Sequence, residues 1–503
     1  MPSKQLKTNP PSKLSADVAI VGAGVTGLTA ALLLARAGRK VVVLDKSSIA
    51  TGESSRTTAH LTEILDTYSH RLIEDFGLHD ARLMATSCRA ALEQIAATVK
   101  SEKIACGFRR VNGYLYTEHE EDVAELREEL EASRQLGMKA SWTKKTPLPF
   151  SVAGALQFDN QAEFHPRRYL LRLAKIISDF GGLILEDTPV LDIKDGGPCQ
   201  IQTEHGVVTA RDVIVATHAP ITNEQILQTK IAPYRTYVLA VKLRKGGGAK
   251  GLFWDSEDPY HYIREWVPSA GKPPLVLIGG EDHRTGQQPD TDKCFAALEQ
   301  YARDHFDISS VVYRWSGQVW EPVHGVPYIG KTFSSERVHV ATGFGGTGMT
   351  LGTLAAMILS DAILGRTNPW ARLYCADRVR PVASAAADYI VENIDYPMHF
   401  VGDRLFGVGS DLEKIGRGEG QVVSVDGAHV AAHRDAEGKL HTCSAVCTHM
   451  GCLVKWNPAE QSWDCPCHGS RFGVDGEVLV SPATKPLSKA PGSRLQASGK
   501  SES

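Results

Sequence analysis

The chain has 503 residues, of which 42% are hydrophobic and 22% are charged, and its formal net charge at pH 7 is −3. At roughly 150 residues per domain, this length predicts about two to four domains. The composition is that of an ordinary globular protein, which excludes disorder of the whole chain, and the slightly acidic balance argues against a strongly basic nucleic-acid binder. Ten cysteines are present, and five of them are clustered: Cys443, Cys447, Cys452, Cys465 and Cys467.

The N-terminus and the apolar stretches show no targeting or membrane signal. Residues 1–15 are polar and lack the apolar core of a signal peptide. The longest apolar stretch, residues 349–364, is interrupted by polar side chains and is shorter than the about 20 residues of a membrane span, so we expect a buried helix there. These features predict a cytoplasmic protein without a membrane span. In that compartment, clustered cysteines indicate metal or redox chemistry rather than a disulfide framework.

Residues 16–45 read as a strand, a glycine-rich turn, a helix and a second strand, the pattern of a dinucleotide-binding unit. Gly22 permits the sharp turn, Gly24 lets a pyrophosphate approach the backbone, and Gly27 lets the helix pack close to the strand. The helix N-terminus supplies free amides for phosphate groups. Asp45 ends the second strand, where an acid accepts hydrogen bonds from ribose hydroxyls. A complete unit of this kind is much more specific than the three glycines alone.

Three later segments predict that the bound dinucleotide is long and embedded. The hydroxyl-rich loop after the first unit adds candidate donors for a second phosphate: Ser54, Ser55, Arg56 and Thr57. A buried strand at 212–217 ends in a small turn at Thr217. A second strand-and-glycine pattern supplies further candidate cofactor contacts: Gly343, Gly345, Gly346, Thr347 and Gly348. Separated pieces that converge on one ligand are typical of such a cofactor.

The chain resembles FAD-dependent oxidases of the D-amino-acid, glycine and sarcosine oxidase family in five segments: residues 16–45, 165–172, 212–217, 315–330 and 338–352. The resemblance covers about residues 14–375. It implies a Rossmann-like α/β FAD-binding domain of the glutathione-reductase type, with an antiparallel-sheet substrate portion at about 230–320. It also implies that residues 343–348 contact the flavin, where a helix N-terminus would stabilise negative charge on the reduced ring. The chain departs from the family at His218, where a glycine is usual, and at His324, where an acid is frequent.

Candidate substrate-binding residues lie in the predicted antiparallel portion. On a strand, Tyr262 and Arg264 would project from the same face, where the guanidinium could hold a substrate carboxylate by two hydrogen bonds. An ordinary solvated strand face would show the same pair. His283 and Asp282, at the polar end of an apolar strand, are weaker candidates. His60 reads as a polar loop histidine rather than a point of covalent flavin attachment, and no catalytic base is predicted.

The C-terminal cysteines combine with histidines in two pairs, Cys447-x-His449 and Cys465-x-x-His468. This pattern resembles the ligand set of Rieske 2Fe–2S proteins. The resemblance implies that the two cysteines hold one iron and that the two histidines hold the other. Two neutral ligands lower the negative charge of the cluster, so it accepts an electron more readily than an all-cysteine cluster. A Cys2His2 zinc site is the alternative, although the sequences CTHMGC and CPCHGS are highly specific.

Further residues match the Rieske proteins of cytochrome bc complexes. Cys452 and Cys467 occupy the positions that form a disulfide between the ligand loops in those proteins, which implies the same disulfide here. Ser470 matches a serine whose hydroxyl bonds a cluster sulfur and raises the potential. The second donor of that type is a tyrosine, and Phe472 stands in its place. We therefore expect a reduction potential below that of respiratory Rieske proteins, because one hydrogen bond to the cluster is missing.

The predicted organisation has two domains. An FAD-dependent oxidoreductase domain spans residues 16–375, a linker 376–415 and a small all-β Rieske domain 416–495, with polar tails at 1–15 and 496–503.

The two cofactors predict an oxidoreductase. We expect FAD to dehydrogenate a small amine, an amino acid or a related substrate, and electrons to pass singly to the 2Fe–2S cluster and on to an external acceptor. One alternative is an electron-transfer component that supplies a separate oxygenase, which would need an NAD(P)H site that no third glycine-rich unit provides. The other is a plain flavin oxidase with a structural or redox-sensing cluster. The identities of the substrate and the acceptor are not predicted.

Overall fold

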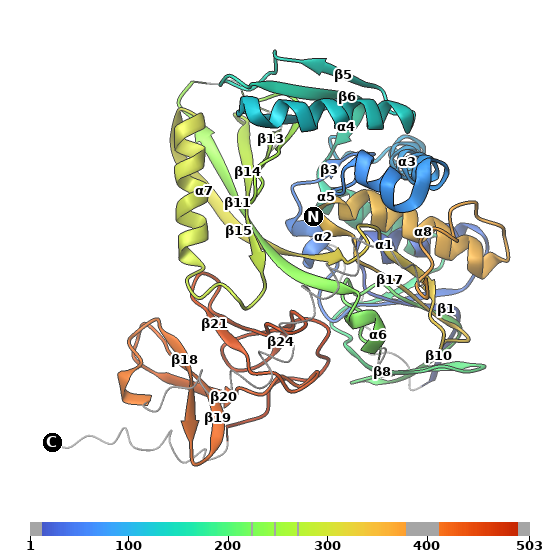
Figure 1. The fold of residues 1–503 in the computed structure, drawn as a ribbon. Helices are drawn as coiled ribbons and strands as arrows, with labels where there is room; N and C mark the ends of the chain where they lie inside the picture. Colours follow the sequence, from blue (N-terminus) through green and yellow to red (C-terminus); the bar gives the residue numbers. More distant parts are fainter. Residues whose placement is uncertain (1–12, 223–224, 246–247, 269–270, 379–411, 491–503) are drawn as a thin grey trace.

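The computed structural model describes residues 13–222, 225–245, 248–268, 271–378 and 412–490. The C-terminal tail, most of the predicted linker and most of the predicted N-terminal tail lie outside the described residues. Two large sheets make up the described chain before residue 378, and two small sheets make up the described chain after residue 412 (Figure 1). The first strand begins at Lys13, inside the predicted polar tail.

The first large sheet has the dinucleotide-binding unit at its centre. Its strands are β1 (Lys13–Val21), β2 (Val41–Leu44), β7 (Leu183–Leu185), β8 (Val190–Lys194), β9 (Cys199–Thr203), β10 (Gly206–Val215), β16 (Tyr328–Lys331) and β17 (Val338–Thr342). The order is β16-β17-β10-β1-β2-β7, with β9 and β8 added beside β10. The strands from β17 to β7 in this order are parallel. Every residue of β2 and β17 is buried, which explains the unbroken apolar sequence of β2.

Four long helices accompany this sheet: α1 (Val25–Arg36), α3 (Ser69–Ser101), α5 (Pro166–Asp179) and α8 (Gly348–Leu364). The segment Gly345–Leu364, which contains α8, is long and apolar enough to cross a membrane, but 72% of it is buried in the structure. It packs against α1 and α3. In this structure α8 is therefore a core helix, as its interrupted apolar sequence predicts.

The second large sheet contains the strands of the predicted substrate portion, about residues 230–320, together with four strands from residues 60–163 that the sequence does not assign to it. Its strands are β3 (His60–Leu61), β4 (Arg109–Thr117), β5 (Ala140–Thr143), β6 (Gly154–Glu163), β11 (Ile231–Leu243), β12 (Leu252–Asp255), β13 (Tyr262–Trp266), β14 (Leu275–Arg284) and β15 (Ile308–Pro322). The order is β15-β11-β14-β13-β12-β4-β6-β3, with β5 beside β6. All pairs are antiparallel except β12 with β4. The predicted fold class is confirmed, with this one parallel pair as a local difference.

Shorter or peripheral helices complete this part of the chain: α2 (Glu53–Arg56), α4 (Val123–Gln135), α6 (Gln225–Gln228), α7 (Asp292–His305), η1 (Glu120–Asp122) and η2 (Gly345–Thr347). α7 packs against β11 and β14, and α4 packs against β5 and β6. Figure 1 shows these two helices at the outer edges of the second sheet.

The C-terminal part is all-β apart from η4 (Leu412–Lys414). One sheet contains β18 (Gly420–Val425), β19 (Ala428–Arg434) and β20 (Leu440–Ser444), and the other contains β21 (Lys455–Asn457), β22 (Ser462–Asp464), β23 (Arg471–Phe472) and β24 (Val478–Val480). Trp463 and Phe472 are fully buried in its core. The loop after β20 carries the first Cys–His pair, and the loop after β22 carries the second.

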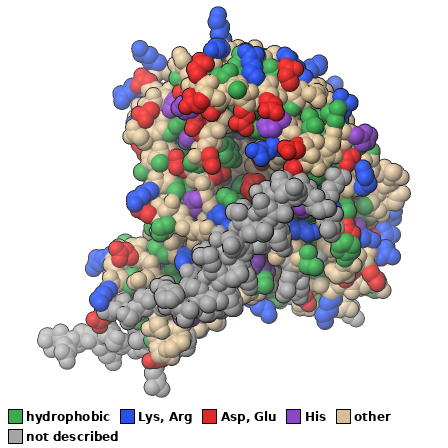
Figure 2. Space-filling model, in the orientation of Figure 1, with side chains coloured by type: hydrophobic (Ala, Val, Ile, Leu, Met, Phe, Trp, Pro, Cys, Tyr) green, Lys and Arg blue, Asp and Glu red, His purple; other side chains and the backbone are tan. Residues whose placement is uncertain are grey.

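The C-terminal sheets lie below the ends of β11 and β15 in the view of Figure 1. Acidic and basic side chains are interspersed over the face seen in Figure 2, in keeping with the small net charge of the chain. Hydrogen bonds join both strands to the C-terminal part, from Arg235 of β11 to Glu460 and from Gln318 of β15 to Gly469.

Candidate active site and cluster site

Two of the three glycines in the turn between β1 and α1 leave no room for a side chain. Gly22 has a φ of +106°, and a Cβ there would lie 2.4 Å from the carbonyl oxygen of Ala216. A Cβ on Gly27 would lie 1.9 Å from the carbonyl oxygen of Gly22. The two glycines thus permit the turn and the close helix–strand packing that the sequence predicts. Gly24 differs from these two, because a Cβ added there would contact only the Ser54 side chain, at 2.9 Å from its Oγ.

The predicted phosphate and ribose contacts converge around this turn. The Asp45 carboxylate accepts hydrogen bonds from the amides of Ala23 (2.6 Å) and Ser47 (2.9 Å), and burial raises its pKa. The amide of Val25 donates to Ser54 Oγ at 3.2 Å. Ser55 Oγ is buried and has no hydrogen-bond partner among the residues that the structure describes. An unsatisfied hydroxyl beside a glycine turn and a helix N-terminus suits the phosphates of a dinucleotide.

The strand β10 ends at a turn with an unusual backbone. Thr217 Oγ1 donates to the carbonyl of Ala219 at 2.5 Å. His218 has a φ of +68°, in the left-handed region that glycine adopts at little cost. This conformation explains why a glycine is usual at this position in the resembled family. Burial lowers the pKa of His218, so the imidazole is neutral at pH 7.

The second glycine turn contacts an acidic side chain that the sequence does not predict there. The amide of Gly346, expected to face the flavin, donates to Asp66 Oδ2 at 2.7 Å. Burial raises the pKa of Asp66 to about 6, against the lowering effect of the Gly346 and Thr347 amides. Sequence reasoning missed Asp66, because no local pattern marks an acid that reaches a turn 280 residues away.

A cavity of about 370 Å³ is lined both by predicted cofactor residues and by a predicted substrate residue. Of the predicted cofactor residues, Arg56, Thr57, Gly346 and Thr347 line it, and so does the substrate candidate Tyr262. Its wall is rich in aromatic and acidic side chains, including Tyr68, Trp254, Tyr260, Glu53, Asp66, Asp255 and Glu257. Arg56 is the one arginine or lysine among the described residues that line it. A second cavity, of about 680 Å³, is lined by basic residues such as Arg39, Lys331 and Arg337 and contains none of the predicted cofactor residues.

The structure separates the two residues that the sequence pairs as a carboxylate anchor. The hydroxyl of Tyr262 shares a hydrogen bond of 2.9 Å with Thr236 at the cavity. Arg264 does not line the cavity. Its guanidinium donates to the carbonyl of Phe164 (3.3 Å) and lies 3.6 Å from Glu163. A buried cation needs such partners, so Arg264 is committed to the protein and is not placed to hold a substrate.

The histidine candidates also lie differently from expectation. His60 belongs to β3 and lines the cavity, so its interpretation as a polar loop residue is wrong. Burial, with a contribution from the Arg264 charge, lowers its pKa to about 3. His283 does not line the cavity and instead shares a hydrogen bond of 2.9 Å with the Tyr237 hydroxyl. Asp282 interacts with Thr236 and Tyr260 behind the cavity wall, and burial raises its pKa to about 7.

The two Cys–His pairs come together between the C-terminal loops. The Cys447 and Cys465 thiols share a hydrogen bond, which, with nearby backbone donors, lowers the pKa of Cys447 to about 7. The rings of His449 and His468 have their centroids 5.1 Å apart. Burial lowers the pKa of His449 to about 4 and that of His468 to about 3. The same hydrogen bond and burial raise the pKa of Cys465, so one of the two sulfurs ionises readily. Two cysteine sulfurs beside two neutral imidazoles are the donor set that a Rieske cluster requires.

Residues around this donor set match the remaining expectations. Cys452 and Cys467 form a disulfide that joins the two loops. Ser470 is fully buried, its Oγ accepts a hydrogen bond from the Ala483 amide (3.0 Å), and it contacts the Cys447 thiol. Phe472 is fully buried nearby, with a ring that offers no donor.

The substitution Phe472→Tyr is expected to raise the reduction potential of the cluster. A tyrosine hydroxyl in this buried place would supply the hydrogen bond that the chain lacks, and such bonds stabilise the reduced, more negative cluster. A redox titration followed by the EPR signal of the reduced cluster measures the shift. An unchanged or lower midpoint would show that position 472 does not reach the cluster.

Comparisons with known proteins agree with both predicted cofactors. The family model "FAD dependent oxidoreductase" matches residues 17–362, and the model "Rieske [2Fe-2S] domain" matches residues 408–491. The Rieske 2Fe–2S iron–sulfur protein YhfW of Bacillus subtilis is 35% identical over 476 residues, 94% of this chain and 92% of that protein. The gamma-glutamylputrescine oxidoreductase of Escherichia coli is 25% identical over 70% of this chain and 84% of its own length.

A solved structure supports the same fold. Glycine oxidase from Geobacillus kaustophilus superposes with a TM-score of 0.62 at 20% identity, over 73% of this chain and 100% of that chain. At this identity the likeness shows the fold alone. The two family models and the full-length relative show more: the chain belongs to the FAD-dependent oxidoreductase family and is an oxidoreductase with two cofactors, FAD and the Rieske 2Fe–2S cluster of its C-terminal domain.

Proposed function

We propose that the chain dehydrogenates a small amine or amino acid at its FAD and passes the electrons through its own Rieske cluster to an external acceptor. In this proposal, Cys447, His449, Cys465 and His468 hold the cluster, and the β1–α1 turn with Asp45 and α2 holds the FAD. Bound FAD would accept two electrons from the substrate in the form of a hydride, and the cluster would carry one electron at a time.

The observation that carries this proposal is the position of Gln318. This residue of β15 is 1% exposed and lines the cavity. Its backbone amide donates to Glu53 Oε2 at 2.9 Å, on the flavin side. Its side-chain Nε2 donates to the carbonyl of Gly469 at 2.9 Å, one residue after the proposed ligand His468. A single buried residue thus contacts both the cavity and a cluster-ligand loop, which supports direct passage of electrons between the two cofactors.

The cavity supports an amine more strongly than an amino acid. Four acidic side chains and several aromatic rings line it, and both attract a substrate cation. The predicted carboxylate anchor, Arg264, is held by Glu163 outside the cavity. The names of the relatives, gamma-glutamylputrescine oxidoreductase and glycine oxidase, allow either class. We therefore place small amines first and amino acids second.

Binding of a cation in the cavity is expected to tighten as the pH rises from about 5 to about 8. The pKa values of Asp66 and Asp282 are raised to about 6 and about 7, so each carboxyl is neutral below its pKa and negative above it. For a cation about 4 Å from the carboxylate, one added charge pair contributes about 1–4 kcal/mol, or at least about fivefold in affinity, and a more distant carboxylate contributes less. A trimethylalkylammonium ion, whose charge does not change with pH, is the suitable ligand for the titration. Asp282→Asn should remove the upper step, and a flat wild-type profile would refute the assignment.

The function is tested by mixing the oxidised holoprotein anaerobically with amines and amino acids. The expected result is bleaching of the flavin by at least one amine, followed by the EPR signal of the reduced cluster. Reduction of the flavin by NAD(P)H would instead support a component that supplies a separate oxygenase. Stoichiometric hydrogen peroxide in air with a cluster that stays oxidised would support a plain oxidase.

A further inference from the structure

We propose that a buried ionic latch holds the Rieske domain in one fixed position on the FAD-dependent domain, so that electrons reach the cluster without domain movement. The latch consists of Arg235, Glu460, Arg471 and Asp464. This inference rests on the proposed function for its electron-transfer role, but the contacts that carry it are independent of any substrate. Each transfer would oxidise the reduced FAD by one electron and reduce the cluster by one electron, with no bond made or broken between them.

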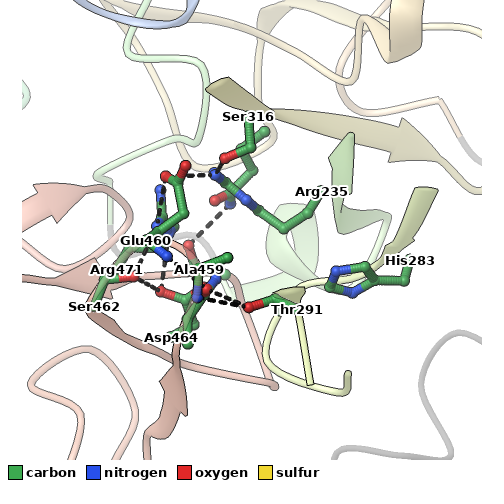
Figure 3. A network of polar contacts seen from close by, with 12 residues as sticks. Arg235, His283, Thr291, Ser316, Ala459, Glu460, Ser462, Asp464 and Arg471 are labelled. Atoms are coloured by element: carbon green, nitrogen blue, oxygen red, sulfur yellow. Dashed lines mark hydrogen bonds and ion pairs between the residues drawn. The ribbon is translucent and has the colours of Figure 1, made fainter. Parts of the chain in front are cut away.

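The first half of the latch crosses from one domain to the other. Arg235 lies on β11, and its side chain has no exposed surface. Its Nη2 donates to Glu460 Oε2, in the β21–β22 turn, at 2.9 Å. The same guanidinium also donates to the hydroxyl of Ser316 on β15. Figure 3 shows Arg235 and Ser316 reaching Glu460 from the sheet of the FAD-dependent domain.

The second half of the latch runs to the cluster loop. Glu460 Oε2 also accepts a hydrogen bond from Arg471 Nη2 at 3.2 Å, and Arg471 Nε donates to Asp464 Oδ1 at 2.8 Å. The side chains of Arg471 and Asp464 are 3% and 2% exposed. Asp464 directly precedes Cys465, a proposed iron ligand. The position of the cluster loop is thus tied, through alternating charges, to β11 of the other domain.

Hydrogen bonds of uncharged groups join the FAD-dependent domain to the β21–β22 hairpin at a second place. Thr291 Oγ1, beside α7, donates to Asn457 Oδ1 at 2.7 Å and accepts a hydrogen bond from the Ala459 amide at 3.1 Å. Asn457 Nδ2 in turn donates to Asp464 Oδ2 at 2.9 Å. Both carboxylate oxygens of Asp464 are therefore fixed, and Figure 3 shows the two sets of contacts meeting there.

The backbones of the two domains also meet without space between them. A Cβ on Gly286, in the loop after β14, would lie 2.9 Å from the Pro466 nitrogen in the cluster loop. A Cβ on Gly469 would lie 2.4 Å from the Pro233 Cβ of β11. Only residues without a side chain allow this approach, because interiors packed at such density give way little.

These contacts favour a Rieske domain that stays docked on the FAD-dependent domain over one that moves. Domains of one chain move relative to one another by default, unless their interface is large and hydrophobic. Here buried ionic and hydrogen-bonded contacts take the place of a hydrophobic interface. Separation of these domains would break the Arg235–Glu460 ion pair and the Thr291–Asn457 hydrogen bond together. The docked position is therefore the stable one, and Arg235 is a positioning residue for the cluster.

Two substitutions in the holoprotein test the latch, each with a matched control. Glu460→Gln removes the charge that Arg235 and Arg471 share, and its control is Glu437→Gln at an exposed turn of the same domain. Gly286→Ala drives a methyl group into the Pro466 backbone. Its control is Gly137→Ala, with a similar φ (+81° against +74°) but nothing within 4 Å. Small-angle X-ray scattering measures docking, and anaerobic stopped-flow mixing with a substrate amine, or flavin photoreduction, measures cluster reduction after flavin reduction at increasing viscosity.

The expected wild-type result is one compact particle whose cluster is reduced at a rate independent of viscosity. Glu460→Gln and Gly286→Ala should expand the particle and slow cluster reduction by at least about tenfold, as loss of positioning does, while both controls match the wild type. A viscosity-dependent wild-type rate, or latch variants that match the wild type in both measurements, would overturn the latch. If the wild-type cluster accepts no electron from the flavin, the proposed function fails, and the scattering of the variants still decides whether the latch exists.

Discussion

Cys447→Ser is expected to give a flavoprotein that its substrate still reduces but that no longer passes electrons to an acceptor. A serine oxygen does not replace a thiolate on iron, and the loss should exceed the about 10–100-fold weakening that follows removal of a supporting hydrogen bond. Cys447 is 2% exposed and belongs to the loop after β20 in the Rieske domain, outside the predicted FAD-binding segments, so FAD binding should be unchanged. Iron analysis and the EPR spectrum of the reduced protein measure the cluster, and anaerobic bleaching measures the flavin.

The matched control for this substitution is Cys443→Ser. Cys443 is also a buried free cysteine of the same domain, on β20, and it has no place in the proposed ligand set. It should keep the cluster and its EPR signal. A Cys447→Ser protein that retains the Rieske signal would show that the ligand assignment is wrong, and a Cys443→Ser protein that loses it would show that any cysteine lost from this core removes the cluster.

Gly24→Ala is expected to release FAD from a protein that remains folded. Gly24 has φ −81° and ψ −169°, a conformation open to any residue, and its Cβ would meet only the Ser54 side chain. The methyl group would occupy the surface that a pyrophosphate approaches. Overpacking of this kind costs typically about 1–3 kcal/mol, or about 5- to 150-fold in FAD affinity. Fluorescence titration of the apoprotein with FAD measures the change.

Gly52→Ala is the control for this second substitution. Gly52 precedes α2 with nearly the same backbone angles, φ −81° and ψ −164°, and a Cβ there would meet nothing within 4 Å. It should bind FAD with the wild-type affinity, and thermal unfolding of the two apoproteins should be alike. Equal FAD affinities in Gly24→Ala and the wild type would contradict the placement of the pyrophosphate at this turn.

The features that the sequence predicts well are those in which adjacent residues carry the information. The unit at 16–45 combines strand, turn and helix in one stretch, so its register follows from local preferences, and β1, α1 and β2 form as expected. Each Cys–His pair is also local, because its two residues lie two or three positions apart in one loop. Their meeting across the disulfide of Cys452 and Cys467 follows once both loops are recognised.

The features that the sequence does not predict depend on distant pairing. The alternation of a strand predicts the face on which Arg264 lies but not the residue it contacts. In the structure its guanidinium lies against Glu163 of β6 and not in the substrate cavity. Asp66 reaches the second glycine turn from 280 residues away, and Arg235 meets Glu460 across 225 residues. No periodicity or motif encodes such contacts. They arise from the way the two large sheets and the Rieske domain pack, which is why the link between the cofactors becomes visible only in the structure.

The central claim is that the electrons of one substrate molecule pass from the flavin to the cluster within the same chain. It is tested most directly by a single anaerobic turnover at low protein concentration, in which flavin absorbance and the rapid-freeze EPR signal of the cluster are followed together. The account predicts that the flavin bleaches first and that the cluster signal then grows at a rate independent of protein concentration. A cluster that stays oxidised after the flavin is fully reduced, or one that is reduced at a rate proportional to protein concentration, would contradict it.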